Sequence, residues 1–241
     1  MTIQNKKVSL NQKREELRKF YKKTTFKSLR TLNALAKKAS IDPEAKFDDL
    51  MRLVSNEGIL FQAIGNISGK ERALTKGPKI DERTVDSTSI KLVKELSSKL
   101  RTGNFRFNPI RRVYIDKSGK KPATEEQLEK LKKLNSAGFV TMQQIKDTRV
   151  RPLGISSFPD KVVQENIRIV LNAIYKPEFA KQNLNKGFRL KYGCVDAILA
   201  IQTKAKAMDY CIEGDIKGAY DNVNHEILMN ILRRKIDTEN F

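Results

Sequence analysis

The sequence predicts a mixed α/β (α+β) protein, because two different hydrophobic periods recur along it. Apolar residues three and four positions apart, as between Ile90 and Leu100, are typical of amphipathic helices. Segments that alternate apolar and polar residues, such as "NFRFNPIRRVYI" (104–115), are typical of strands. With 241 residues, the chain is long enough for one large domain or two small ones with a real hydrophobic core.

The first element is a strongly basic N-terminal extension, which we expect to be helical. Its first 40 residues hold twelve Lys and Arg against two Glu, which is half of the net charge of +20. Phe20, Tyr21 and Phe26 are interleaved with these cations, and aromatic rings can stack on unpaired bases while cations neutralise phosphates. The candidate RNA-binding residues are Lys13, Arg14, Arg18, Lys19, Lys22, Lys23, Lys27 and Arg30. The alternative is a solvated extension whose aromatic residues only dock on the body of the protein.

Two amphipathic helical segments follow the extension. Residues 47–64 indicate one helix and its continuation, interrupted near Gly58, and residues 88–101 indicate another. Between them, a loop rich in glycine and proline is expected over residues 65–78. The stretch "GNISGKE" in this loop resembles a phosphate-binding loop, but it is one residue too short and has Glu71 where a hydroxyl is needed.

Two strands are expected on either side of a polar insertion. The alternating segment 104–115 indicates strand structure broken by Pro109, and residues 149–151 begin a second strand, because a residue that precedes proline avoids the helical region. The insertion, about 117–148, is charged and polar. Within it, Glu125–Leu134 is expected to form a surface helix with Thr124 as its N-cap.

A long helix is expected after the second strand. Ser157 or Asp160 can cap it near Pro159, and apolar residues then recur at helical spacing. Pro177 is expected to end it, because proline lacks the N–H that a helix interior needs. A further helix is expected over residues 195–208.

The segment "YCIEGDIKGAYD" (210–221) combines a short apolar run, two glycines and several acidic residues. We expect a short strand over 210–216, a tight turn at Gly218, and a helix that begins after an Asn224 cap. A carboxylate at the rigid end of a strand suits Mg²⁺, and nucleotidyl transfer uses several such carboxylates around two metal ions. Asp215 is therefore a candidate metal ligand; the alternative is that it caps the following turn.

The composition narrows the class of protein further. A pI near 9.9 favours polyanions or anionic membrane surfaces as partners. No run of 18 apolar residues exists, and the first residues resemble neither a secretory signal nor an import presequence. Cys194, Cys211 and the single His225 cannot make a four-ligand zinc site. Two cysteines allow a disulfide, but buried reduced thiols are favoured, and His225 is expected at a helix start.

The order of these segments resembles that of group II intron-encoded reverse transcriptases. "CIEGDIKGAYDNVNHEIL" resembles their first catalytic motif, "GNFRFNPIRRVYI" and "RPLGISSFPDKVVQENIRIVLNAIYKPEF" their two fingers motifs, and "KGFRLKYGCVDAI" the segment that follows. The match runs from about residue 85 to the end of the chain, with a weaker one over 47–80. It implies a right-hand polymerase with a helical basic extension (1–46), fingers (47–208) and the start of the palm (209–241).

The resemblance also implies roles for residues of the catalytic motif. Asp215 is the position that binds both catalytic Mg²⁺ ions, and the backbone carbonyl of Ile216 is a further metal ligand. Ala219 and Tyr220 match the floor beneath the sugar of the incoming nucleotide, where a bulky ring excludes a 2′-hydroxyl.

Lys117 and Arg151 match two basic fingers residues that hold the triphosphate, a task that suits the guanidinium group. Three features depart from the family pattern. About thirty residues separate this pair, where a short turn is usual, and "GFRLKYGCV" replaces the usual "GFRPGRS.H". The chain also ends at Phe241, before the paired aspartates ("YADD") of such families. We therefore expect residues 1–241 alone to lack polymerase activity.

Two main functions remain open from the sequence. The first is the N-terminal portion of a reverse transcriptase and maturase that binds group II intron RNA to promote splicing and, at full length, copies RNA into DNA at a DNA target. The second is a non-catalytic RNA-binding splicing cofactor or ribonucleoprotein subunit derived from such an enzyme. A basic domain that binds RNA non-specifically is a third. No membrane partner is expected, and the expected location is an organelle matrix (mitochondrion or plastid, organelle-encoded) or the bacterial cytoplasm.

Overall fold

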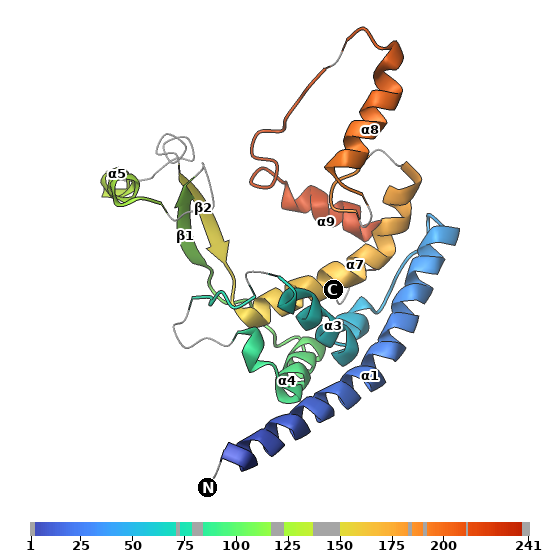
Figure 1. The fold of residues 1–241 in the computed structure, drawn as a ribbon. Coiled ribbons are helices and arrows are strands. Elements are labelled where there is room, and N and C mark those ends of the chain that lie inside the picture. Colours follow the sequence, from blue (N-terminus) through green and yellow to red (C-terminus); the bar gives the residue numbers. More distant parts are fainter. Residues whose placement is uncertain are drawn as a thin grey trace.

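A computed structural model describes residues 3–70, 73–78, 84–116, 123–136, 150–182, 185–189, 192–210 and 212–237. The mixed α+β class predicted from the sequence is confirmed. Figure 1 shows a helical body from which a small two-stranded sheet and the pair α8 and α9 project in different directions. The body consists of α1 (Ile3–Ile41), α2 (Leu50–Val54), α3 (Glu57–Ser68), the 3-10 turn η1 (Val85–Ser87), α4 (Ile90–Arg101) and α7 (Phe158–Gln182).

The N-terminal extension is helical as predicted, and it forms one continuous helix of 39 residues, α1. Its second half shares the hydrophobic core with α3 and α7, since Leu32 and Ala39 are buried there. Helix α1 approaches α3 closely at Gly58: a Cβ atom at this position would lie 2.2 Å from Ser28 Oγ and 2.5 Å from the Thr24 carbonyl oxygen. Glycine is therefore needed at this crossing, because any side chain would force the two helices apart.

The break between α2 and α3 falls at Ser55 and Asn56, two residues before the predicted interruption at Gly58. The Asn56 side chain caps α3 by accepting hydrogen bonds from the N–H groups of Gly58 (2.9 Å) and Ile59 (3.3 Å), which explains the shift. The prediction of a loop from residue 65 was wrong for its first residues. Helix α3 continues to Ser68 because Ile67 is buried against the core.

Polar side chains from α4 and α7 bind the carbonyls at the end of α2. Ser97 Oγ donates to the Ser55 carbonyl at 2.6 Å, and Asn166 Nδ2 donates to the Val54 carbonyl. The last carbonyls of a helix have no partner within it, so these side chains satisfy groups that burial would otherwise leave unpaired. The core thus joins α2, α4 and α7 through polar contacts as well as apolar packing.

Helix α7 begins as predicted and ends later than predicted. The N–H of Asp160 donates to Ser157 Oγ at 3.2 Å, in the region proposed for the cap. Pro177 was expected to end the helix, but α7 continues through it to Gln182. Contacts made by the residues around the proline offset the lost backbone hydrogen bond: Ile174 is buried in the core, and Glu178 forms an ion pair with Lys235.

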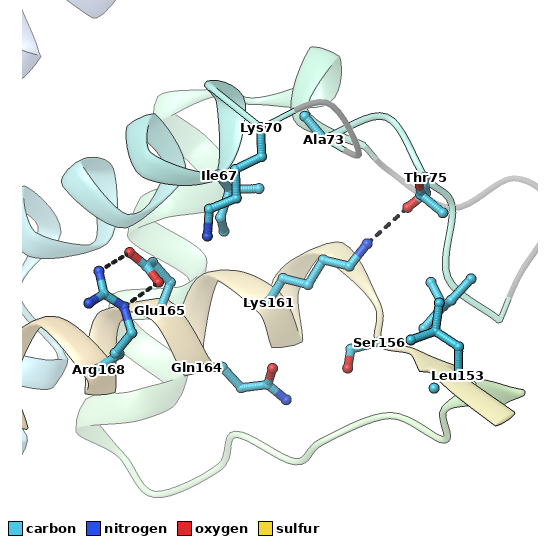
Figure 2. A pocket seen from close by; sticks show the side chains of 12 residues that line it. Ile67, Lys70, Ala73, Thr75, Leu153, Ser156, Lys161, Gln164, Glu165 and Arg168 are labelled. Carbon is cyan, nitrogen blue, oxygen red and sulfur yellow. Dashed lines mark hydrogen bonds and ion pairs between the residues drawn. The ribbon is translucent and has the colours of Figure 1, made fainter. Parts of the chain in front are cut away.

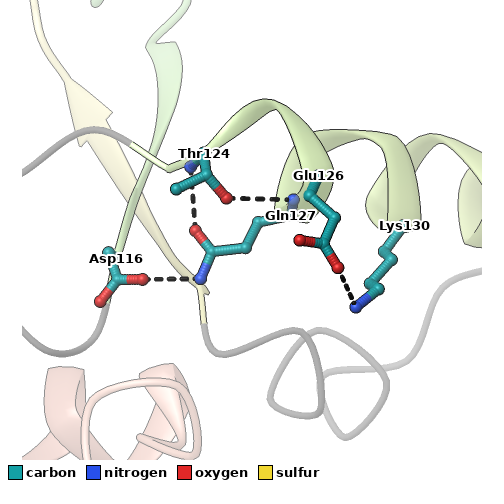
Figure 3. Close-up of polar contacts among 5 residues, drawn as sticks. All are labelled: Asp116, Thr124, Glu126, Gln127 and Lys130. Atoms are coloured by element: carbon teal, nitrogen blue, oxygen red, sulfur yellow. Dashed lines mark hydrogen bonds and ion pairs between the residues drawn. The ribbon is translucent and has the colours of Figure 1, made fainter.

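The sheet consists of β1 (Arg111–Asp116) and β2 (Val150–Ile155), paired antiparallel with Arg111 opposite Ile155. The predicted surface helix, α5 (Glu125–Ser136), lies between them in the chain. Figure 3 shows its capping box: Thr124 Oγ1 accepts from the Gln127 N–H, and Gln127 Oε1 accepts from the Thr124 N–H. Gln127 Nε2 also donates to Asp116 at 2.6 Å, which fixes the start of α5 to the end of β1.

The last part of the chain contains α8 (Cys194–Lys204), the 3-10 turn η2 (Ala205–Ala207) and α9 (His225–Arg233). Asn224 caps α9 through the Ile227 N–H (3.1 Å), and His225 is the first helical residue, as predicted. The predicted strand over 210–216 was wrong for the residues described in that range, because the described residues supply no neighbouring strand with which it could pair. Cys194 is exposed and free, contrary to the expected burial, and Cys211 lies outside the described residues.

After α9 the chain returns to the helical body. Phe47 and Ile236, both buried, form a parallel β-bridge. The Phe47 N–H donates to the Lys235 carbonyl at 2.8 Å, and the Asp237 N–H donates to the Phe47 carbonyl at 2.9 Å. This clamp, residues 235–237 on Phe47, ties the end of α9 to the core.

Candidate functional site

The predicted metal ligand lies in an exposed loop with a well-defined turn. All residues from Ile212 to Leu228 are exposed, including Asp215. The turn is closed by Asn222, whose side chain donates to the Lys217 carbonyl (2.9 Å) and whose N–H donates to the Gly218 carbonyl (3.0 Å). Gly218 has φ of 60°, and a Cβ there would lie 3.1 Å from Asn222 Nδ2, so this tight turn requires glycine as the sequence predicted.

The same loop holds the backbone of Ile216 and the side chains of Ala219 and Tyr220, the other predicted residues of the motif. The Tyr220 side chain is 84% exposed, and no element of the body covers it. Within the described residues, no group of three or more His, Cys, Asp or Glu side chains is close enough together to hold a metal ion. The described residues therefore do not fit a complete magnesium site, and Asp215 supplies at most one carboxylate ligand of it.

Arg151, predicted to hold the triphosphate, lies exposed on β2 opposite Ile115. The part of the chain that the structure describes has no hydrogen bond or ion pair between Arg151 and the loop of Asp215. Lys117, its predicted companion, lies outside the described residues. Because side chains alternate along a strand, Arg151 shares one face of β2 with Leu153 and Ile155.

Leu153 and Ile155 line a hollow of about 490 Å³ that the sequence analysis missed. We call it the α3–α7 hollow (Figure 2). Its apolar part comes from the end of α3, from residue 73 and from β2, while its charged part comes from Lys70, which follows α3, and from α7. Its lining residues are Ile67, Lys70, Ala73, Thr75, Leu153, Gly154, Ile155, Ser156, Lys161, Gln164, Glu165 and Arg168.

The charges of this hollow are held in defined positions. Arg168 binds Glu165 through two hydrogen bonds of 2.6 and 2.7 Å, and Asn66 Nδ2 donates to the same carboxylate at 2.8 Å. Lys161 Nζ donates to the Thr75 carbonyl at 2.9 Å, and Figure 2 shows Lys70, just after the end of α3, pointing toward the Glu165 pair. Three cations and one carboxylate leave the hollow positively charged above an apolar floor.

Burial alone would raise the pKa of Glu165. Hydrogen bonds from Arg168 and Asn66, together with the charges of Arg168 and Lys70, outweigh that effect and hold the pKa below its ordinary value. Glu165 is therefore ionised at neutral pH and fixes the Arg168 guanidinium at the rim of the hollow. The spacing of Lys161, Glu165 and Arg168, at i, i+4 and i+7 of one helix, is the signal that could have revealed this face from sequence.

The predicted RNA-binding cations lie along α1. The side chains of Arg18, Lys19, Lys22, Lys23, Lys27 and Arg30 are all exposed, whereas those of Lys13 and Arg14 lie outside the described part of the chain. One exposed ion pair, Lys19 to Glu15 at 3.4 Å, lies among them. This face of α1 can therefore contact a polyanion without breaking the hydrophobic core.

The three aromatic residues of α1 are not equivalent. Phe20 and Tyr21 dock on Phe61 of α3, with ring centroids 6.0 and 5.3 Å away, as the alternative interpretation expected. Phe26 is 64% exposed, and the Arg30 guanidinium lies 5.1 Å from its ring centroid. Helix α1 thus carries two aromatic side chains that pack on α3 and one that is exposed to solvent.

Comparison with known proteins places the chain among proteins encoded within introns. It is 30% identical over 205 residues to the group II intron-encoded protein LtrA of Lactococcus lactis subsp. cremoris, which covers 85% of this chain and 29% of LtrA. It is 32% identical to an uncharacterized 91 kDa protein in the cob intron of Schizosaccharomyces pombe, over 88% of this chain and 23% of that protein. It is 26% identical to the putative COX1/OXI3 intron 2 protein of Saccharomyces cerevisiae, over 96% of this chain and 23% of that protein.

The chain is therefore related to group II intron-encoded proteins, as its motifs predicted. It spans less than a third of the length of these three relatives. No protein-family model matches it. Among the described residues, none of the helices combines the length and apolar character that a membrane crossing requires.

Proposed function

We propose that this chain is the N-terminal part of a group II intron reverse transcriptase and maturase, and that it binds intron RNA to promote splicing. The observation that carries the proposal is the similarity to LtrA, a group II intron-encoded protein, over 85% of the chain. In the full-length protein, RNA-templated DNA synthesis at a DNA target would serve intron mobility. The proposed setting is a ribonucleoprotein complex in an organelle matrix or in the bacterial cytoplasm.

The exposed cations of α1 support the RNA-binding part of this proposal. They lie on a helix whose other side is fixed to α3 and α7, so the positive surface has a defined position on the body. Cations that neutralise phosphates release counterions, which is the main source of affinity for nucleic acid. An excess of 20 positive charges in the whole chain strengthens this attraction.

The β1–β2 hairpin and the α3–α7 hollow support the assignment of fingers to residues 47–208. Arg151 shares one face of β2 with two apolar residues that line the hollow. A single bound nucleic-acid chain would therefore place a phosphate at Arg151 and an apolar group in the hollow. We propose that Arg151, together with Lys117, holds the triphosphate of an incoming nucleotide. Residues 209–241 would form the start of the palm.

Asp215 and the Ile216 carbonyl are proposed ligands of Mg²⁺ in a complete active site, and Ala219 and Tyr220 the floor beneath the nucleotide sugar. Such a site needs carboxylates beyond those that the described residues bring together. We therefore predict no magnesium-dependent primer extension by purified residues 1–241. DNA synthesis by this fragment, abolished by Asp215→Asn, would contradict the prediction.

A binding titration tests the RNA-binding proposal directly. Purified residues 1–241 would be titrated with a group II intron RNA and with an unrelated structured RNA of equal length, at several salt concentrations. We expect tighter binding to the intron RNA at every salt concentration and a linear fall of log K with log salt. Equal affinity for the two RNAs would contradict a maturase role and favour non-specific binding.

A set of variants assigns that binding to α1. Lys23→Gln, Lys27→Gln and Arg30→Gln remove three exposed cations, and we expect the salt slope to become shallower by about 0.7 for each lost contact to single-stranded RNA. Lys91→Gln with Lys94→Gln, on the exposed side of α4, is the matched control and should leave the slope unchanged. With the full-length protein, splicing assistance without any DNA synthesis would favour the non-catalytic cofactor.

A further inference from the structure

We propose that a hollow between α1 and α3 binds one unpaired nucleotide of RNA by stacking its base on aromatic side chains. The inference rests on the RNA-binding function proposed above and adds a specific subsite to it. The hollow, called here the aromatic hollow, is lined by Leu17, Arg18, Tyr21, Lys22 and Phe61 and encloses about 580 Å³.

The aromatic hollow combines rings from two helices. Phe61 of α3 contacts both Phe20 and Tyr21 of α1, with ring planes tilted by 57° and 50°. Phe20 is half-buried and completes the packing between the helices, whereas the Tyr21 side chain is still 43% exposed. One ring therefore fastens the helices together, and the other leaves apolar surface open beside it.

The charge around this apolar surface is positive. Arg18 and Lys22 line the hollow on either side of Tyr21 in the sequence, and both are exposed. Among the described side chains, no hydrogen bond or ion pair engages either of them, whereas the neighbouring Lys19 is paired with Glu15. Two uncommitted cations beside an open aromatic ring complement a phosphate next to a base.

These features favour an unpaired RNA nucleotide as the occupant. A duplex keeps its base faces stacked inside the helix, so it can meet the cations but cannot use the rings. A nucleotide in a loop or bulge can use both, and stacking of a base on an aromatic ring is tolerant of sequence. The aromatic hollow thus gives α1 a preference for unpaired RNA that charge alone does not provide.

The chain contains no tryptophan, so a single Trp can report on this hollow. Tyr21→Trp places a fluorescent ring in it, and Phe179→Trp, on α7 and 51% exposed outside the hollow, is the matched control. We expect single-stranded RNA to quench Tyr21→Trp emission in step with binding, and to change Phe179→Trp emission much less. Equal quenching of both reporters would overturn the proposal.

Affinity measurements separate stacking from packing. We expect Tyr21→Ala to weaken binding of a hairpin RNA with an unpaired loop by about five- to 150-fold, with little effect on a fully paired duplex. Tyr21→Leu keeps an apolar side chain against Phe61, so it should fold normally and still lose affinity for the loop. A thermal melt of each variant verifies folding.

The RNA supplies an independent test. An abasic nucleotide in the loop should weaken binding to the wild-type protein but have no further effect on Tyr21→Leu, because each change removes the same contact. Additive losses, or unchanged loop affinity in a folded Tyr21→Leu variant, would overturn the stacking site while leaving the general RNA-binding function intact. Absence of binding by the wild-type protein would instead overturn the proposed function.

Discussion

The helical body and the segment from Cys194 to Arg233 both contain amphipathic helices, yet they bury very different amounts of apolar surface. Helix α3 buries Gly58, Ile59, Leu60, Ala63, Ile64 and Ile67, whereas α8 and α9 bury none of their residues. Ile198, Leu199, Ile227 and Ile231 are each about half exposed or more. Tertiary packing therefore holds the body together, and local hydrogen bonds define the helices of the second region.

The difference also separates the two parts of the proposed function. The side chains of α1 that we propose to bind RNA are positioned by a packed core, so their arrangement does not depend on the segment from Cys194 to Arg233. The loop of Asp215 is held by its own turn and by the cap of α9. The metal motif consequently has a defined local shape but no described neighbours that enclose it.

The largest loss of stability should come from a substitution that creates a cavity in the core of the helical body. Leu60 is completely buried, and we expect Leu60→Ala to lower the free energy of unfolding by about 2–5 kcal/mol. Ile227→Ala removes a similar amount of hydrocarbon from α9, but its side chain is 58% exposed, so the change should stay within about 0.5 kcal/mol. Urea unfolding followed by circular dichroism measures both. Comparable losses of stability would show that α9 is packed in solution, and would contradict the difference in burial between α9 and the helical body.

Replacing either of two glycines in α3 by alanine should change the stability of the protein, but in opposite directions. Gly58→Ala places a methyl group 2.5 Å from the Thr24 carbonyl oxygen, a backbone atom that cannot rotate away, and should destabilise the protein by about 1–3 kcal/mol. Gly65 has nothing within 4 Å of its would-be Cβ, so Gly65→Ala should stabilise the helix by about 0.5–1 kcal/mol. Thermal melts report both signs. A destabilising Gly65→Ala would contradict the geometry of α3.

Glu165→Gln should have a smaller effect that depends on pH. The pKa of Glu165 is held below its ordinary value, so the ionised carboxylate stabilises the folded state above the pKa of the unfolded chain, and this contribution is lost as the pH falls through the folded pKa. We expect a loss of about 1–2 kcal/mol at neutral pH, reduced from the value for a buried charged pair because Arg168 is 59% exposed.

Unfolding measured at several pH values tests this sign. The difference between the wild type and Glu165→Gln should shrink as the pH falls below about 4. Glu126→Gln is the matched control: Glu126 pairs with Lys130 at 2.8 Å, but both side chains are exposed, so no change in stability is expected. A difference that is constant with pH would mean that shape, not charge, makes the Glu165 contact stabilising.

The sequence predicted the elements whose signals are local. Helix α4, the Thr124 capping box, the Asn224 cap and the turn at Gly218 all depend on residues within a few positions of one another, and all are present. Two of the failures depend on contacts that are distant in the sequence. Pro177 does not end α7 because core packing and the pair with Lys235 support its last turns, and the strand over 210–216 lacks a described partner.

For the candidate site, too, local motifs could be predicted from the sequence, whereas contacts between distant segments could not. Motif resemblance predicted roles for Asp215 and Arg151, but it could not show that the loop of Asp215 is exposed. It also missed the α3–α7 hollow, because residue 67 and residues 153–168 meet only in the folded chain. Charge counting found the basic face of α1, while the docking of Tyr21 on Phe61 depends on the Gly58 crossing and could not be deduced from spacing.

The smallest effect concerns two helix caps of the same chemistry. Asn56→Ala removes the cap of α3 and a contact with Ser28 Oγ (2.7 Å), so we expect the whole protein to lose about 1–2 kcal/mol. Asn224→Ala removes the cap of α9, whose residues are not buried, so the global unfolding midpoint should stay unchanged. Amide hydrogen exchange should instead show faster exchange confined to His225–Arg233. A fall in the global midpoint as large as that of Asn56→Ala would mean that the clamp of residues 235–237 on Phe47 couples α9 to the core, so that the two regions unfold as one unit.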